Sequence, residues 1–346
     1  MRSYGERGNG VRSRIVVLGA GLIGLYVGGA LHAAGAEVAL IGRERMRRYT
    51  EAPLVLTDLE GGRTEIPAGT LDYSLDATAL ADAGLVLLAV KSADTGDAAD
   101  LLAAHAPQRP VVLSLQNGVG NIDVLQTRLP DYEVVPGMVP FNVVSPSPGR
   151  LHRATEGGLM AGRTDALDPW LPSFAAAGLP VTLRADFVPV QWGKMLLNLN
   201  NAVNALAGVP LRAELSQRSY RRVLALLVEE ALAALRAAGI RPARVTKVPP
   251  SALPTLLRVP DAVFSRLAGA MLRIDPEARS SMAEDLDAGR RTEIEYLNGA
   301  VVRLAERAGV DAPVNRAVVE LVHAAEAGAF SKLPGDELFA TVSRDR

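Results

Sequence analysis

The feature that most constrains the fold is a glycine-rich turn between a short apolar run and a helix-like segment. Residues 14–18 read RIVVL, residues 19–24 read GAGLIG, and the helix-like stretch that follows ends at Gly35. A second apolar run, EVALI at residues 37–41, comes directly after it. This order predicts a strand, a helix and a second, parallel strand, which is the opening unit of a doubly wound α/β domain.

The spacing GxGxxG in this position predicts a dinucleotide-binding turn. Gly19 permits the tight turn, Gly21 lets a pyrophosphate approach the backbone, and Gly24 allows close packing of the helix. The N–H groups at the start of the helix would face the anion. A glycine-rich turn without a ligand is the alternative, but the position between a strand and a helix favours the dinucleotide. The predicted cofactor-binding turn is Gly19, Ala20, Gly21, Leu22, Ile23 and Gly24.

The residues that follow the second strand indicate which dinucleotide binds. A carboxylate at this position would bond the ribose 2′-hydroxyl of NAD, whereas a guanidinium would pair with the 2′-phosphate of NADP. Here Arg43 and Arg45 flank Glu44. Arg43, assisted by Arg45, would pair with the 2′-phosphate, so we predict NADPH/NADP+ as the cofactor. Glu44 leaves NAD open, and Arg45 as a solvated surface charge is the alternative for that residue.

Patterning along the rest of the chain predicts two domains. LVLLAV at residues 85–90 and PVVLSL at residues 110–115 read as buried parallel strands. Further strand-like pieces lie around residues 133–145, 151–161 and 180–184. Long helical patterns replace them at residues 190–207, 216–238, 261–273, 281–308 and 313–328. We expect an α/β Rossmann domain at 14–188, an all-α helical domain at 189–346, and a disordered leader at 1–13.

Composition narrows the function classes. The chain has no cysteine, which excludes disulfides and thiol nucleophiles and is compatible with a reducing cytosol. Its four histidines lie in no metal-ligand spacing, so no metal site is expected. Lys and Arg number 37 against 38 for Asp and Glu, so no overall field favours nucleic acid or a membrane. We expect a cytoplasmic protein with a small-molecule substrate, whose Ala- and Leu-rich helical half could form a homodimer.

Polar residues follow two of the predicted strands. Lys91 comes after the run at 85–90, and Asn117 comes after the run at 110–115. Doubly wound sheets bind ligands at the carboxyl ends of their strands, so both side chains are predicted to face the nicotinamide or the substrate. A helix cap and a turn residue are the alternatives, especially for Asn117, which precedes a glycine.

Two helical segments also carry polar groups. Lys194, Asn198 and Asn201 are spaced i, i+4 and i+7 and therefore share one helix face. A bound polar substrate or the neighbouring backbone could satisfy these amides. Within the predicted helix 281–308, Ser281, Asp285 and Glu293 are spaced so that one face could present them to a cleft. A solvated charged face is the alternative interpretation.

These segments, in this order, resemble the ketopantoate reductase family from about residue 14 to residue 330. The resemblance rests on GAGLIG, on Arg43, on AVK ending at Lys91, on LQNGVG at 115–120, on WGKMLLN ending at Asn198, and on RSSMAEDLDAGRRTEIEYLNG at 279–299. It implies a Rossmann domain followed by a helical domain. It also implies NADPH-dependent reduction of 2-dehydropantoate to (R)-pantoate, on the pathway to pantothenate and coenzyme A.

The resemblance further implies roles for individual residues. Lys194 matches the family's catalytic lysine, and Glu293 matches its catalytic acidic residue. The substrate-contacting positions are matched by Asn117, Asn198 and Ser281, and Lys91 and Asn117 match positions near the cofactor. The chain departs from the family where position 202 is Ala and further amides stand at 200, 201 and 204. This leaves open whether Asn201 or another amide completes the site.

Two other functions remain open on the sequence alone. One is a related reductase acting on another small 2-keto acid or a keto lactone. The other is a non-catalytic NADP(H)-binding sensor that keeps the glycine turn but performs no reaction.

Overall fold

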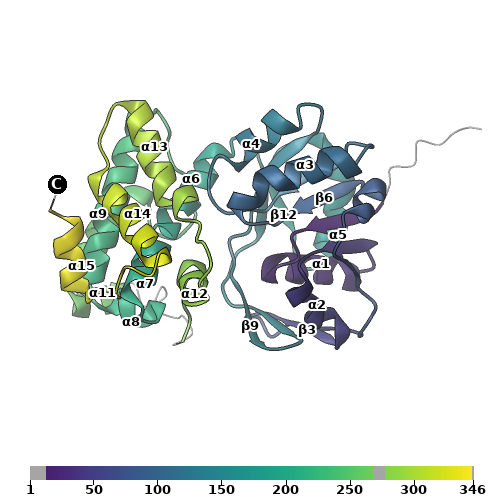
Figure 1. Cartoon of the computed structure of the whole chain (residues 1–346), viewed down its shortest axis with the longest axis horizontal. Coiled ribbons are helices and arrows are strands. Elements are labelled where there is room, and N and C mark those ends of the chain that lie inside the picture. The colour runs from purple at the N-terminus through teal and green to yellow at the C-terminus, as the bar shows by residue number, and fades with distance from the viewer. Residues whose placement is uncertain (1–12, 268–276, 345–346) are drawn as a thin grey trace, which may run out of the picture. The chain divides into compact units, whose positions relative to one another are not determined.

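The computed structural model describes residues 13–267 and 277–344, which form two compact units (Figure 1). The first unit contains the described residues up to Gln116 together with Asn121–Ala185, and the second contains Asn117–Gly120 together with the described residues from Asp186 onward. The predicted leader lies outside the described residues, except for Ser13.

The first unit is built on an eight-stranded sheet with the order β12-β11-β8-β7-β6-β1-β2-β5. Its central strand β1 pairs in parallel with both β2 and β6. The strands are β1 (Ile15–Leu18), β2 (Val38–Ile41), β5 (Asp72–Ser74), β6 (Leu85–Leu88), β7 (Val111–Ser114), β8 (Val134–Met138), β11 (Leu159–Gly162) and β12 (Val181–Arg184). The other neighbouring strands of this sheet also pair in parallel, except β8 and β11, which are antiparallel. The predicted α/β fold, with a mostly parallel sheet, is therefore confirmed.

Alternation along β1 shows why the sequence of this strand is entirely apolar. Ile15 and Val17 belong to the apolar core on one face of the sheet, and Val16 and Leu18 belong to the core on the other. Helices thus cover both faces, and a strand buried on both faces reads as a continuous hydrophobic run. The helices of this unit are α1 (Leu22–Ala33), α2 (Glu44–Glu51), α3 (Thr95–His105), α4 (Asn121–Arg128) and α5 (Leu171–Ala176), with 3-10 turns η1 (Thr78–Asp82), η2 (Ser92–Asp94) and η3 (Asp165–Trp170).

A second, four-stranded sheet with the order β4-β3-β10-β9 belongs to the same unit. Its strands are β3 (Leu54–Thr57), β4 (Arg63–Ile66), β9 (Val143–Ser147) and β10 (Arg150–Arg153). The sequence pattern predicts no strand over residues 54–74, where β3, β4 and the edge strand β5 of the first sheet lie. Three of the four residues of β4 are exposed, so its sequence carries little of the apolar signal that marks a buried strand.

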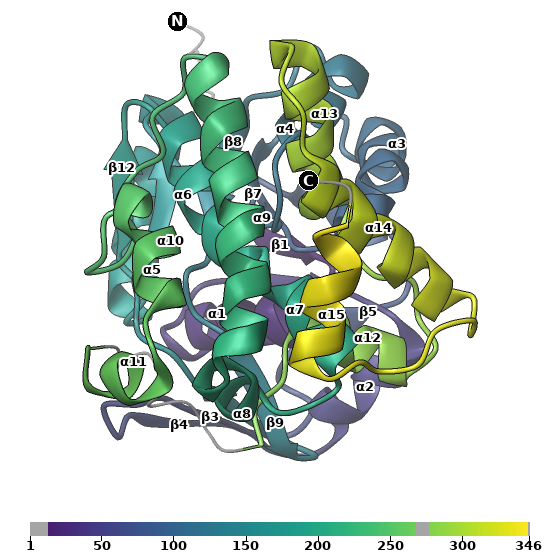
Figure 2. The same cartoon turned by 90° about the vertical axis from the view of Figure 1, so that its left-hand side faces the viewer.

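Helices make up the second unit, whose described residues contain no strand. They are α6 (Val188–Asn198), α7 (Asn200–Ala207), α8 (Leu211–Ser216), α9 (Arg218–Ala237), α10 (Leu253–Arg258), α11 (Asp261–Leu267), α12 (Ser281–Asp287), α13 (Asn298–Ala308), α14 (Pro313–Glu326) and α15 (Gly335–Val342), with the 3-10 turns η4 (Pro250–Ala252) and η5 (Ile294–Tyr296). The long helix α9 packs against α10, α13 and α15, as Figure 2 shows. No helix among the described residues is long and apolar enough to cross a bilayer.

The prediction of a single helix over residues 281–308 is wrong. The chain forms α12, leaves the helical conformation at Gly289, which has φ +63°, and resumes as η5 and α13. Glu293 therefore does not share a helix face with Ser281 and Asp285. The helix predicted over 190–207 is present as the consecutive helices α6 and α7. The end of the helix predicted over 261–273 lies outside the described residues.

Candidate active site

The glycine turn has the geometry that a dinucleotide requires. Gly19 has φ +106°, and a Cβ on it would lie 2.5 Å from the backbone nitrogen of Val90. A Cβ on Gly24 would lie 2.4 Å from the carbonyl oxygen of Gly19. By contrast, a Cβ on Gly21 would have no atom within 4 Å. Close packing thus requires glycine at positions 19 and 24, whereas Gly21 borders open space at the start of α1.

The start of α1 suits an anion. Gly21 is the N-cap residue and brings no side chain to cap the helix, and the first turn contains no acidic residue. The first N–H groups of a helix have no partner within the helix and carry a partial positive charge. These groups, with the open space beside Gly21, fit the pyrophosphate of NADPH.

Arg43 lies close to this turn. The preceding residue, Gly42, packs against the turn so closely that a Cβ on it would lie 2.8 Å from the Cβ of Ala20. The Arg43 side chain is 62% exposed, and its Nη2 is 2.7 Å from Oδ2 of Asp94. Sequence reasoning missed Asp94, which follows a different strand. A 2′-phosphate bound to Arg43 would have to share the guanidinium with this carboxylate.

Lys91 immediately precedes the η2 turn and follows Ala89-Val90 after the end of β6. The backbone around it is held by the buried side chain of Gln116, whose Nε2 donates to the carbonyl of Val90 (3.2 Å) and to Oγ1 of Thr95 (2.8 Å). Gln116 thereby ties the carboxyl end of β7 to the segment that carries Lys91. The sequence motif contained Gln116, but a single amide after a strand gave no signal of this role.

The second unit brings three of the predicted residues together. Nζ of Lys194, on α6, donates a hydrogen bond of 2.8 Å to Oδ1 of Asn117, which is 77 residues away in the sequence. Glu293 immediately precedes η5, and its negative charge acts on the same ammonium group. Lys194, Asn117 and Glu293 are all partly buried. A cation, an amide and a carboxylate thus form one cluster.

Burial changes the acidity of this lysine. Desolvation lowers the pKa of Lys194 from 10.5 to about 8, while the charge of Glu293 acts in the opposite direction. An ammonium with this pKa is still mostly protonated at neutral pH but releases its proton far more readily than a surface lysine. This is the property that a general acid needs.

The four amides that follow Lys194 fall into two groups. Asn198 and Asn201 are partly exposed, whereas Asn200 and Asn204 are buried. Each buried amide donates a 3.1 Å hydrogen bond from Nδ2 to Oε2 of Glu214. The buried pair is therefore engaged within the fold, which favours Asn198 and Asn201 as the amides that face a substrate.

Glu214 is a buried carboxyl that sequence reasoning missed. It has no exposed surface, and burial raises its pKa to about 8, although the hydrogen bonds from Asn204 and Asn200 act to lower it. It comes from α8, whose sequence LRAELS reads as an ordinary solvated helix. Only the packing of α8 on α7 reveals its position.

The residues of α12 are connected to the same region. Ser280 caps α12, its N–H donates to Oδ1 of Asn204 (2.9 Å), and its Oγ donates to the carbonyl of Asn201 (3.0 Å). Ser281 is the exposed residue that follows this anchor. Asp285 is buried and its Oδ1 is 2.9 Å from Nε of Arg290, so its carboxylate serves the local structure.

Comparisons with known proteins agree over most of the chain. Residues 15–166 match the family model described as ketopantoate reductase PanE/ApbA, and residues 186–326 match the model of its C-terminal part. The chain belongs to the ketopantoate reductase family. The 2-dehydropantoate 2-reductase of Halobacterium salinarum is 33% identical over 326 residues, which cover 90% of this chain and 99% of that protein. The enzyme of the same name from Mycobacterium tuberculosis strain H37Rv is 28% identical, over 91% and 98% of the two chains.

Solved structures show the same relationship. A ketopantoate reductase family protein from Ralstonia eutropha JMP134 superposes with a TM-score of 0.76 at 30% identity, over 91% of this chain and 99% of the other. A D-mandelate dehydrogenase, solved with NADH and anilino(oxo)acetate, shares the fold with a TM-score of 0.73 at 22% identity, over the same shares of the two chains. Ketopantoate reductases are NADPH-dependent oxidoreductases, so the predicted family, enzyme class and cofactor are confirmed.

Proposed function

We propose that this family member reduces 2-dehydropantoate to (R)-pantoate with NADPH, as a step of pantothenate and coenzyme A biosynthesis, and that Lys194 is the general acid. The observation that carries the proposal is the Lys194 ammonium, which is desolvated, bonded to Asn117 and under the charge of Glu293. Desolvation distinguishes it from a surface lysine such as Lys332, which is half exposed although it also pairs with a carboxylate, that of Asp287.

The mechanism follows from the charge that develops on the substrate. NADPH, when bound, supplies the hydride that converts the ketone to an alcohol. The carbonyl oxygen gains negative charge in this step, and the Lys194 ammonium can stabilise that charge and donate the proton. Asn117 accepts a hydrogen bond from Nζ and so holds the amine in one orientation. Glu293 favours the protonated form of the lysine, so that the proton is present before reduction.

Other residues would bind the two reactants. Gly19, Ala20, Gly21, Leu22, Ile23 and Gly24 would hold the pyrophosphate, with Arg43 on the 2′-phosphate and Lys91 nearby. Asn198, Asn201 and Ser281, with Asn117, would bind the keto acid. The hydrogen bonds of Asn200 and Asn204 to Glu214 support this choice among the amides.

The test is the loss of NADPH absorbance with 2-dehydropantoate in wild-type protein and in Lys194→Ala. We expect the turnover number to fall by about 10²–10⁴-fold, the usual contribution of a positioned general acid. Lys247→Ala, which removes an exposed lysine of the same unit, is the matched control and should retain activity. Wild-type turnover by a folded Lys194→Ala protein would contradict the assignment.

A second candidate is reduction of another small 2-keto acid or a keto lactone. It is favoured by Ala202, which departs from the family pattern, and by the shared fold of the D-mandelate dehydrogenase. A panel of branched, unbranched and aromatic 2-keto acids, compared by kcat/KM, separates the two candidates. NADPH binding without turnover of any substrate would instead indicate a sensor.

We further propose a cytoplasmic homodimer. The Ala- and Leu-rich helical unit supports this, and a ketopantoate reductase from Staphylococcus aureus is described as dimeric. Light scattering on the purified protein tests the oligomeric state directly.

A further inference from the structure

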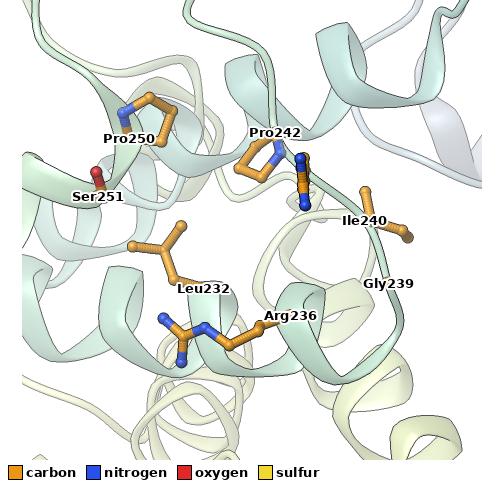
Figure 3. Close-up of a pocket in the computed structure, with 8 residues that line it drawn as sticks. Leu232, Arg236, Gly239, Ile240, Pro242, Pro250 and Ser251 are labelled. Atoms are coloured by element: carbon orange, nitrogen blue, oxygen red, sulfur yellow. The ribbon is translucent and has the colours of Figure 1, made fainter.

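A cavity of about 590 Å³ lies in the helical unit, lined by residues that have no part in the proposed reaction. Its volume is within the range of small-molecule sites. Figure 3 shows Leu232 and Arg236 on one helix, with Pro242, Pro250 and Ser251 across from them. The lining residues are Leu232, Arg236, Gly239, Ile240, Arg241, Pro242, Pro250 and Ser251.

The charged side chains that line this cavity are all positive. Residues 231–260 contain five Arg and Lys residues and no Asp or Glu, although the whole chain is nearly neutral. Two of these cations, Arg236 and Arg241, line the cavity. Across the described ranges 13–267 and 277–344, no ion pair joins either guanidinium to an acidic side chain.

The acidic residues of α9 are occupied elsewhere. Glu229 binds the guanidinium of Arg258 through both of its carboxylate oxygens. Glu230 accepts hydrogen bonds from the N–H groups of Val314 and Asn315, each 2.9 Å, at the start of α14. The two arginines of the cavity are therefore available to an anion from solution.

The favourable interaction of a cation with a helix C-terminus does not by itself explain why both Arg236 and Arg241 line the cavity. Arg236 stands in the last turn of α9, where a cation is favourable in any helix. Arg307 occupies the same position in α13 but lines no part of this cavity. Arg241 comes from the loop after α9, outside the helix, and still lines the same cavity.

The remaining walls define the rest of the ligand. Leu232, Ile240, Pro242 and Pro250 offer apolar surface, and Ser251 adds one hydroxyl. Two guanidiniums beside an apolar wall suit a carboxylate or phosphate group carried on a short aliphatic body.

The loop that forms one wall also packs on the helix that carries Lys194. After Pro242, the N–H of Ala243 donates a 2.7 Å hydrogen bond to the carbonyl of Pro189 in the first turn of α6. The carbonyl oxygen of Ala243 lies against Gly193, where a Cβ would be only 2.3 Å away. A shift of this loop therefore acts on α6 directly beside Lys194.

We propose that this cavity is a second ligand site, for a small organic anion with an apolar body, and that its occupancy is transmitted to α6 through the loop 240–245. The binding half of this proposal does not depend on which keto acid the enzyme reduces, or on whether it reduces one.

Calorimetry on the full chain tests the site, with 4-methylpentyl phosphate and 4-methylpentanoate as probes and 4-methylpentan-1-ol as the neutral control. Saturating NADP+ and 2-dehydropantoate are included to occupy the proposed active site. We expect saturable binding of an anion, weakened about tenfold or more by Arg236→Ala and by Arg241→Ala, and unaffected by Arg307→Ala. Tighter binding of the phosphate or of the carboxylate identifies which group the natural ligand carries.

Three results would overturn the site: no saturable heat with either anion, equal binding of the neutral alcohol, or equal weakening by Arg307→Ala. Arg236 and Arg241 are exposed, so their alanine variants are expected to fold, and thermal melting checks this.

Tryptophan emission tests the connection to α6. The chain has two tryptophans, and Trp192 immediately precedes Gly193. In Trp170→Phe, the emission of Trp192 should change with the same midpoint as the calorimetric titration. If that variant does not fold, Trp192→Phe must lose a change that wild-type protein shows. Binding without any change in Trp192 emission would refute the coupling.

Discussion

Replacement of Glu293 by Gln should lower the pH at which the enzyme loses activity. The pKa of Lys194 is about 8 because desolvation lowers it while the Glu293 charge raises it. Glutamine keeps the size of the side chain but removes the charge, so only the lowering effect remains. The pKa of Lys194 must then fall below that of the wild type.

The size of the change follows from the proximity of the two groups. An opposite charge in close range shifts a pKa by about 1–3 units, so the pKa of Lys194 in Glu293→Gln should lie at about 5–7. With a pKa of about 8, roughly three quarters of the lysine is protonated at pH 7.5; with a pKa of about 6.5, the protonated fraction is roughly one tenth. We therefore expect kcat/KM at pH 7.5 to fall about eightfold from this cause, with near recovery at lower pH.

The assay is the pH profile of kcat/KM for the keto acid, followed by NADPH absorbance. Its basic limb should lie near pH 8 in the wild type and move to lower pH in Glu293→Gln. Glu295→Gln is the matched control, because Glu295 is half exposed and pairs with Arg303 and His323 instead. A basic limb that stays in place in Glu293→Gln, or that moves equally in Glu295→Gln, would refute the reasoning.

Three further predictions concern stability and cofactor binding. Because burial raises the pKa of Glu214 to about 8, the free energy of unfolding of the wild type should fall as the pH rises from about 4.5 through 8. Glu214→Gln stays neutral at every pH. The variant should therefore melt at a higher temperature than the wild type at pH 9 and lose this advantage at pH 5. A variant that melts below the wild type at pH 9 would contradict this. Asp94→Asn should lower the KM for NADPH, because it releases Arg43 from its ion pair, whereas Arg43→Ala should raise it about 10–100-fold with little effect on NADH; an unchanged preference in both would exclude a 2′-phosphate contact. Gly21→Ala should melt like the wild type but bind NADPH more weakly, because the added Cβ meets no protein atom. Gly24→Ala should be destabilised, because its Cβ would meet the backbone of Gly19. Melting curves and calorimetric binding separate the two effects.

The sequence by itself determined the features that depend on neighbouring residues. The βαβ unit could be predicted because strand, turn and helix each leave a local pattern, and Gly24 is required by its contact with the carbonyl oxygen of Gly19 within that unit. The contact that requires Gly19, with Val90 after β6, comes from outside the unit. The spacing of Lys194 and Asn198 likewise follows from helix periodicity within α6, whereas Asn201 lies in the next helix, α7.

Only the tertiary structure decided which polar groups meet. Asn117 reaches Lys194 across 77 residues, and Arg43 pairs with Asp94 across 51, and neither pairing leaves a periodic signal in the chain. The turn at Gly289 separated Glu293 from the face of Asp285. Asn200 and Asn204 both donate hydrogen bonds to the buried carboxyl group of Glu214, so these two amides stabilise the fold. Local patterns specify backbone conformation, but acidity and hydrogen bonding depend on distances between distant elements, which packing alone sets.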